Sequence, residues 1–229
     1  MHEITLSGRG PNTMSHAMLE SLEREIDASN DAPIVITGAG DAFSAGLELD
    51  ALAKAGASDV ALLLAVMDRV VRKLFLHPAP TLALVNGHAV AGGCLLVQCC
   101  DVRVGSDDPR IRIGMTGVAI GLTYPPFVTN VFRHRVAPPH VETALLGAER
   151  HGPHEALRIG LLDELAPPDA LRETGLARLA VRTKLPRAAY AATKRALREH
   201  AFATSAAEHE RFEREVVPAW TSALLRRPR

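Results

Sequence analysis

The sequence predicts an α/β fold, with a largely parallel sheet, helices between its strands and a helical C-terminal part. Two observations support this class. Short apolar runs typical of buried strands alternate with longer segments of helical periodicity. After residue 121 the strand signals fade, and segments that begin with proline follow one another. A chain of 229 residues is long enough for one domain that buries roughly 70–75% of its unfolded surface.

Each predicted strand is an apolar run bounded by turn residues or by a helical segment. Strands are expected at residues 3–7, 33–37, 81–85 and 101–105, with helices at 15–28, 60–76 and 93–99 between them. This alternation is typical of βα units, whose strands pair in parallel. The apolar residues 60–67 are too few to span a bilayer and are followed by charges, so we expect a core helix there.

The C-terminal part is expected to be helical, with helices that begin near Pro138, Pro153, Pro168, Pro186 and Ser205. No low-complexity linker separates it from the rest. We therefore predict a core of residues 1–165 and a helical subdomain of residues 166–229. An apolar stripe at four-residue spacing, for packing within the chain or against a partner, is formed by Phe212, Val216, Trp220 and Leu224.

The composition narrows the possible partners and compartments. The 26 basic residues balance 26 acidic ones, so the charge does not favour nucleic acid, and the basic residues 226–229 are interpreted as a chain end. The three cysteines, Cys94, Cys99 and Cys100, have no metal-ligand spacing, which predicts no metal site and fits a reducing compartment. No signal-like or membrane-spanning segment is visible, and the sequence therefore predicts a cytoplasmic protein.

Two strand-to-helix junctions are rich in small residues. The run 81–85 leads through Gly87, Ala91, Gly92 and Gly93 into an apolar helix, and the run 33–37 leads through residues 38–46 into another. Small residues leave backbone N–H groups uncovered, and the start of a helix adds positive charge. Two such junctions are what an oxyanion hole built from two segments requires.

The residues of these junctions match a known family. Phe43-Ser44-Ala45-Gly46-Leu47-Glu48-Leu49 is followed by Asn86-Gly87-His88-Ala89-Val90-Ala91-Gly92-Gly93-Cys94 and by Cys100-Asp101-Val102-Arg103. This pattern resembles the crotonase superfamily, the enoyl-CoA hydratase and isomerase fold, and looks most like the mitochondrial-type Δ3,Δ2-enoyl-CoA isomerases.

The resemblance implies a fold, a substrate class and an assembly. The fold is a crotonase-like ββα superhelix with a helical C-terminal region that forms homotrimers, sometimes paired into hexamers. The partner is an acyl-CoA thioester of fatty acid metabolism, with coenzyme A as part of the substrate and no separate cofactor.

The resemblance also implies site residues. The N–H groups of Ala45 and Gly92 would bind the thioester oxygen, and each such donor is typically worth about 3–4 kcal/mol when the enolate forms. Substrate contacts are expected from the neighbouring positions Ser44, Gly46, Leu47 and Gly93, and also from Leu95 and Gly117. Arg9 is the candidate for the CoA phosphates; otherwise it is a solvated loop cation.

The two carboxylates that hydratases of this superfamily use are absent. Their positions are taken by Leu95 and Gly117, and neither residue can accept a proton. A general base typically contributes about a hundredfold to ten-thousandfold, so we expect very poor hydratase activity. Restoring the missing base with Gly117→Glu is expected to raise isomerase activity.

Three residues are candidates for a substitute base. Tyr124 resembles the phenol of crotonase-type decarboxylases, or is a partly buried aromatic with a backbone partner. Glu48 lies beside the first junction, where it would also suit a first helical turn. His88 is either a proton carrier or a semi-buried imidazole with its hydrogen bonds satisfied.

Three functions stay open on the sequence alone. The first is an enoyl-CoA isomerase-like enzyme that transfers a proton through an enolate with a non-standard base. The second is an acyl-CoA binding protein without catalysis. The third is a crotonase-type acyl-CoA decarboxylase that uses Tyr124. The acyl length, and the choice between CoA and a carrier-protein thioester, stay open too.

Overall fold

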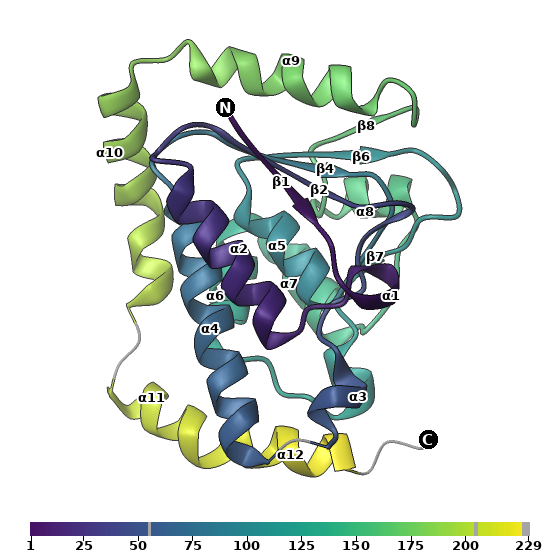
Figure 1. The fold of residues 1–229 in the computed structure, drawn as a ribbon, viewed down its shortest axis with the longest axis vertical. Helices are drawn as coiled ribbons and strands as arrows, with labels where there is room; N and C mark the ends of the chain where they lie inside the picture. Colours follow the sequence, from purple (N-terminus) through teal and green to yellow (C-terminus); the bar gives the residue numbers. More distant parts are fainter. Residues whose placement is uncertain (55, 204–205, 226–229) are drawn as a thin grey trace.

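The computed structural model, which describes residues 1–54, 56–203 and 206–225, confirms the α/β fold. Five parallel strands form the main sheet in the order β1-β2-β4-β6-β8 (Figure 1). The strands are β1 His2–Leu6, β2 Ile34–Gly38, β4 Thr81–Val85, β6 Val102–Ser106 and β8 Glu164–Ala166. The first four lie within one residue of the predicted bounds, whereas the short β8 was not predicted.

A second, smaller parallel sheet was not predicted either. Its strands are β3 Ala42–Ser44, β5 His88–Val90 and β7 Ile113–Gly114. Each follows a strand of the main sheet and precedes a helix, so that units of two strands and one helix repeat along the chain. This repeat is the expected ββα superhelix, and it places successive strand-to-helix junctions side by side.

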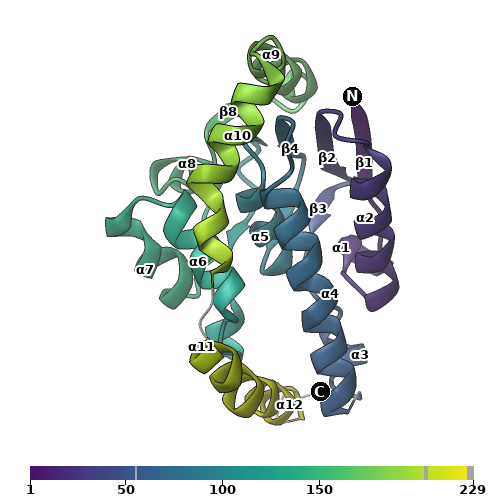
Figure 2. The same cartoon turned by 90° about the vertical axis from the view of Figure 1, so that its left-hand side faces the viewer.

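Helices α2, α4 and α5 lie on one side of the main sheet (Figures 1 and 2). They span His16–Ala28, Ala57–Phe75 and Gly92–Cys99. The Ser15 hydroxyl caps α2 by accepting a hydrogen bond from the Met18 N–H at 3.2 Å. Helix α4 begins three residues before the predicted start, and the Gly56 N–H donates to the Asp59 carboxylate at 3.1 Å there.

The C-terminal part is helical, as expected. Proline begins three of its helices, α6 Pro126–Arg135, α7 Pro138–Leu146 and α8 Pro153–Arg158, of which α6 was not predicted. The later helices are α9 Leu171–Thr183, α10 Arg187–Arg198, α11 Ala206–Arg211 and α12 Val217–Leu225. Short helical segments complete the chain: α1 Arg9–Asn12, α3 Leu49–Leu52, and turns at Gly117–Ile120, Glu199–Phe202 and Phe212–Val216.

The main sheet is covered on both faces. Helix α9 packs on the face opposite α2 and α4, over a small apolar cluster of Val35, Leu82, Leu84, Val102, Val104, Ala166, Leu171 and Leu179. From α9, α10 leads to α11 and α12 at the far end of α4 (Figure 2). The predicted boundary after residue 165 falls inside β8, and the assignment of residues 166–229 to subunit contacts stays a prediction. Residues 204–205 and the basic tail 226–229 lie outside the described part.

Candidate active site

A cavity of about 90 Å³ lies between the two glycine-rich junctions and helices α4, α6 and α12. Six of the ten predicted site residues line it: Ala45, Leu47, Gly92, Leu95, Gly117 and Tyr124. Lining residues that the sequence analysis did not place in the site include Leu64, Met67, Thr116, Phe127 and Trp220. The wall is almost entirely apolar, which strengthens any electrostatic interaction made inside.

The first junction follows β3. Its free N–H group is not that of Ala45, which was the predicted donor. The Ala45 N–H donates to the Pro11 carbonyl at 3.0 Å, so this group is not available to a ligand. The two residues around Leu47 both bond to Met14: the Gly46 carbonyl accepts from its N–H at 2.8 Å, and the Glu48 N–H donates to its carbonyl at 3.1 Å. Within the described part of the chain the Leu47 N–H meets no acceptor, which makes it the free donor of this junction.

The second junction provides another free N–H group. Gly92 is the first residue of α5, so its N–H has no acceptor in the preceding helical turn, nor one elsewhere among the described residues. The helix start also adds positive charge. Before it, Ala91 adopts φ +50°, a left-handed conformation that costs a non-glycine residue of order 1–3 kcal/mol. Strain of this kind persists only where the surrounding structure holds it.

The two junctions touch one another. A Cβ atom on Gly46 would lie 2.9 Å from the Gly92 nitrogen, and Gly46 has φ +85°. Both observations require glycine at this position. Its missing side chain lets the Leu47 and Gly92 segments approach closely enough to face one cavity.

Three predicted substrate contacts lie behind the cavity instead of on its wall: Ser44, Gly46 and Gly93. The buried Ser44 hydroxyl donates to the Asn12 carbonyl at 2.7 Å and accepts from the Gly46 N–H at 3.2 Å. A Cβ on Gly93 would lie 2.3 Å from the Ser44 carbonyl oxygen. These residues pack the junctions together and do not line the cavity, so their predicted contact with a substrate stays a prediction.

Tyr124 is the titratable side chain of the cavity. Its hydroxyl oxygen accepts from the Gly117 N–H at 2.9 Å, which leaves the phenolic proton free to donate. A Cβ on Gly117 would lie 2.8 Å from the Tyr124 ring, so the ring fills the space that a side chain at 117 would need. Burial raises the pKa of Tyr124 and keeps the phenol neutral. Besides Tyr124, the described lining includes polar side-chain atoms on Thr116 and Trp220, and it contains no carboxylate, imidazole or cationic side chain.

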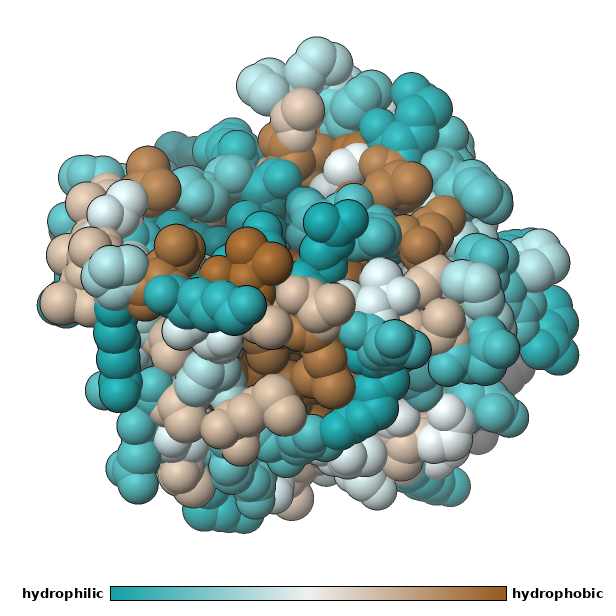
Figure 3. Space-filling model, turned by 90° about the horizontal axis from the view of Figure 1, so that it is seen from above, coloured by the Kyte–Doolittle hydropathy of each residue, from teal (hydrophilic) through white to brown (hydrophobic). Residues whose placement is uncertain are grey.

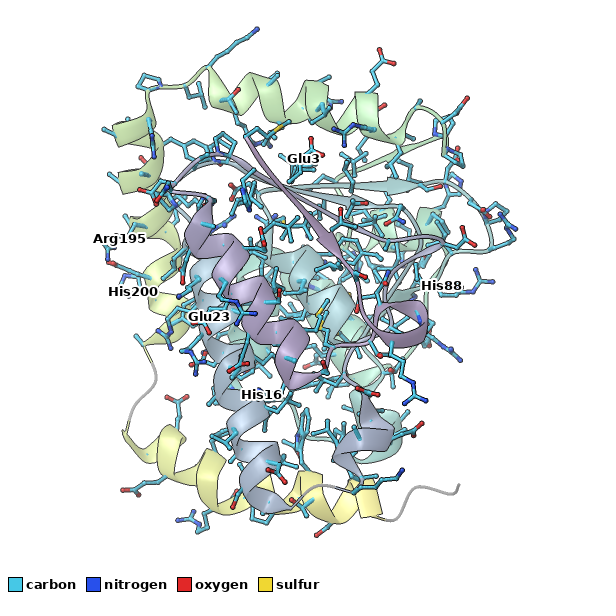
Figure 4. All side chains as sticks on the ribbon, in the orientation of Figure 1. Glu3, His16, Glu23, His88, Arg195 and His200 are labelled. Atoms are coloured by element: carbon cyan, nitrogen blue, oxygen red, sulfur yellow. The ribbon has the colours of Figure 1, made fainter. Side chains whose placement is uncertain are left out.

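The other candidate bases lie outside the cavity. Glu48 borders a depression that shares Leu47 and Leu49 with the cavity and that we call its mouth. The Glu48 carboxylate lies 3.4 Å from the guanidinium of Arg9, whose side chain is 86% exposed. His88 lies at the edge of the molecule (Figure 4), where its Nδ1 accepts from the Arg112 N–H at 2.9 Å. The expectation of a semi-buried His88 is therefore wrong, because β5 turns this side chain to the surface.

The C-terminal stripe packs within the chain. Val216, Trp220 and Leu224 are all buried. The Trp220 indole closes one side of the cavity and donates to the Thr123 carbonyl at 2.6 Å. Cys94 of α5 is fully buried and does not line the cavity, and burial raises the pKa of its thiol to about 12, so it does not supply a thiolate.

The sequence model of the enoyl-CoA hydratase/isomerase family matches residues 2–223. The chain belongs to the enoyl-CoA hydratase/isomerase family. This family member is 30% identical over 151 residues to the mouse mitochondrial enoyl-CoA delta isomerase 1, covering 66% of this chain and 52% of the relative. It is 36% identical over 168 residues to the human mitochondrial enoyl-CoA hydratase domain-containing protein 3, covering 71% and 54%. The chain thus spans about half the length of these curated relatives.

Solved structures agree with the crotonase fold of this family. An enoyl-CoA hydratase/isomerase family protein from Pseudomonas syringae superposes with a TM-score of 0.86 at 25% identity, over 93% of each chain. The human mitochondrial delta3-delta2-enoyl-CoA isomerase superposes with a TM-score of 0.83 at 23% identity, over 97% of this chain and 85% of that one. The second likeness concerns the fold alone. The family resemblance and the fold predicted from the sequence are confirmed.

Proposed function

We propose that this family member binds an acyl-CoA thioester in the cavity and stabilises its enolate oxygen with the N–H groups of Leu47 and Gly92. The observation that carries the proposal is this pair of free donors, on touching junctions beside an apolar cavity. Donors fixed in a site that excludes water typically contribute about 3–4 kcal/mol each to the transition state. Leu47 replaces Ala45 in the predicted pair.

The enolate is proposed to arise by loss of carbon dioxide from a 2-carboxyacyl thioester of the malonyl type. The bond between C2 and the carboxylate breaks, its electron pair forms the enolate, and CO₂ leaves. C2 then takes the proton of the Tyr124 hydroxyl, and water returns a proton to the phenolate. This order suits a neutral phenol, because the step that forms the enolate needs no base.

The surroundings of the cavity support this reaction. A carboxylate held against an apolar wall has lost its hydration, and its departure as neutral CO₂ relieves that cost. The described lining also offers no carboxylate or imidazole that would remove a proton from carbon. The hydroxyls of Tyr124 and Thr116 are the side-chain donors that the leaving carboxylate would meet.

Isomerase-like proton transfer is the second candidate, favoured by the 30% identity to an enoyl-CoA delta isomerase. It requires one group to remove a proton and to return it at another carbon. In this cavity that group would again be Tyr124, which would have to act first as a phenolate. A non-catalytic acyl-CoA binding protein is the third possibility and an outcome of the following test.

The test is to incubate the protein in deuterated water with methylmalonyl-CoA and, separately, with a 3-enoyl-CoA, followed by chromatography and mass spectrometry. We expect propionyl-CoA that carries solvent deuterium at C2. A 2-enoyl-CoA product with no decarboxylation would establish the isomerase instead. Binding of both thioesters without any product would leave the non-catalytic binding protein.

The mouth, the assembly and the location of the protein stay predictions. Arg9 borders the mouth and remains the candidate for the CoA phosphates, although Glu48 offsets part of its charge. Apolar side chains on the face seen from above (Figure 3), and the exposed Val181, Leu185 and Leu197, support subunit contacts in a homotrimer or hexamer. None of the helices in the described ranges is long and apolar enough to cross a membrane. The cytoplasmic location remains an expectation from the sequence.

A further inference from the structure

A second cavity lies directly beside the candidate active site. It has a volume of about 350 Å³ and is bounded by α4, by the start of α6 and by Ala201, Phe202, Phe212 and Val217. Leu64 of α4 and Phe127 of α6 line both cavities. These two side chains therefore form a partition between them.

The second cavity has an apolar interior and a charged rim. Ala61 and Ala65 leave room along α4, and the aromatic rings of Phe202 and Phe212 face the same space. The charges at its edge are already engaged: Arg69 pairs with Glu23 at 3.0 Å, and Arg72 pairs with Asp68 at 3.4 Å. The Arg72 guanidinium also stacks on Phe202 at 4.4 Å. The chemistry of this space suits a hydrocarbon chain better than an anion.

The partition is firmly packed. Leu64 is 1% exposed and Phe127 is 7% exposed, and both belong to the main apolar core. Displacing either side chain would disturb packing that is as dense as an organic crystal. The active cavity alone, at about 90 Å³, is well below the roughly 300–1,000 Å³ of pockets that enclose drug-sized ligands.

We propose that Leu64 and Phe127 restrict the substrate to short acyl groups, by closing the path from the active cavity into the second one. This inference rests on the proposed acyl-thioester binding and adds the substrate class. An acyl chain of a few carbons fits in front of the partition. A longer chain fits only if the partition opens, and its distal methylenes would then lie in the second cavity.

The test measures dissociation constants by calorimetry for butyryl-, hexanoyl-, octanoyl- and dodecanoyl-CoA, which are saturated and cannot react by the proposed chemistry. The variant Leu64→Ala removes part of the partition, and Phe127→Leu reduces it with less loss of core volume. Leu62→Ala is the matched control, because it is the same substitution on the same helix at a residue that is 58% exposed. Thermal denaturation establishes that each variant is folded.

In the unchanged protein we expect affinity to rise from butyryl to hexanoyl and then to level off or fall. In Leu64→Ala or Phe127→Leu, affinity should continue to rise, since each newly buried methylene strengthens binding about fourfold. Dodecanoyl-CoA should gain at least about tenfold relative to butyryl-CoA, and Leu62→Ala should change nothing.

The outcomes separate this inference from the proposed function. Affinity that rises steadily to dodecanoyl-CoA in the unchanged protein would overturn the partition and leave acyl-thioester binding intact. The partition would also be overturned if affinity levels off with chain length in the unchanged protein and neither Leu64→Ala nor Phe127→Leu changes this pattern. If no thioester of any length binds the unchanged protein, the proposed function itself fails and this inference falls with it.

Discussion

The proposed proton transfer depends on one hydroxyl group, that of Tyr124. Removing it with Tyr124→Phe keeps the ring against Gly117 and the apolar wall intact. We expect product formation to fall by about 10²–10⁴-fold, the usual contribution of a positioned acid or base. Affinity for a saturated acyl-CoA should stay within about twofold, because the variant leaves the proposed thioester donors, the N–H groups of Leu47 and Gly92, unchanged. Initial rates and calorimetry check this, and Tyr190→Phe is the control because that tyrosine lies outside the cavity.

The pH dependence of the reaction follows from the same hydroxyl group. Burial raises the pKa of Tyr124 above its ordinary value of 10, so the protonated form persists through the neutral range. The rate should therefore be level from about pH 6 to pH 9 and decline only as the pH rises through the raised pKa. The Tyr124 hydroxyl also stabilises the fold, because its pKa is raised on folding. This contribution is complete below pH 10 and is lost as the pH rises through the raised pKa. A rate that begins to decline with rising pH before pH 8 is reached would point to a different acid.

The space shared by residues 117 and 124 changes how a base can be restored. The sequence alone suggested Gly117→Glu, but a side chain at 117 would strike the Tyr124 ring at 2.8 Å. We expect the single variant to lack isomerase activity, and the double variant Gly117→Glu with Tyr124→Leu to convert 3-enoyl-CoA to 2-enoyl-CoA. Chromatography of the two isomers measures this. Equal activity of the single and double variants would argue against the steric explanation.

The free N–H groups of the two junctions show how far residue-level prediction reached. Small residues at these junctions led us to expect uncovered backbone N–H groups near residues 45 and 92, and the structure has free N–H groups at Leu47 and Gly92. The sequence did not reveal that the loop at Pro11 returns to accept the Ala45 N–H, which transfers the free donor to Leu47. Hydrogen bonds between distant segments depend on tertiary structure, and local composition does not encode them.

At the scale of elements, prediction succeeded for the longer strands of the main sheet. The first four have five residues each and were located within one residue; β2 and β4 are mainly apolar and buried, whereas β1 alternates between exposed and buried positions. Strands β3, β5 and β7 have only two or three residues beside glycines, so they resemble loops until their partners are known. Helix α6 begins at the second of two prolines and was not predicted, although Phe127 and Val131 repeat at helical spacing on its buried face.

Helix α10 is tied to the main sheet by a buried charge cluster. Asp101 precedes β6, and its carboxylate accepts from Lys194 and Arg198, each at 2.8 Å, and from the Tyr190 hydroxyl at 2.9 Å. Asp101→Asn would leave two buried cations without their counter-charge. We expect it to lower the free energy of unfolding by about 3–5 kcal/mol, measured by urea denaturation. Glu155→Gln, which breaks an exposed pair on α8, should cost less than about 1 kcal/mol.

The acid stability of the protein should reflect the same cluster. Burial alone would raise the pKa of Asp101, but the charges of Lys194 and Arg198 lower it below its ordinary value of 3.8. A carboxylate whose pKa is lowered on folding stabilises the fold at every pH above its ordinary pKa, here 3.8. Its contribution is lost as the pH falls through the lowered pKa. The difference in stability between the unchanged protein and Asp101→Asn should therefore shrink on acidification below about pH 4.

At the scale of the whole molecule, the cavity is lined by residues from both the N-terminal core and the last described helix. The ββα core supplies the backbone donors, and the last helix supplies Trp220 as a wall. A core of residues 1–165 alone would leave that side open. The sequence placed Trp220 on an apolar stripe but left its partner undecided, because the stripe itself does not identify the surface that it packs against.

Trp220 is the only tryptophan in the chain, so its fluorescence reports directly on this cavity. A saturated short-chain acyl-CoA should displace water next to the indole and shift or quench its emission in a saturable titration. Coenzyme A without an acyl group should leave the emission unchanged, because it would contact the mouth but not the interior. The affinity from fluorescence should equal that from calorimetry. Calorimetric binding of the acyl-CoA with no change in emission would mean that the acyl group lies elsewhere, since a ligand in a cavity of about 90 Å³ has no position remote from its Trp220 wall.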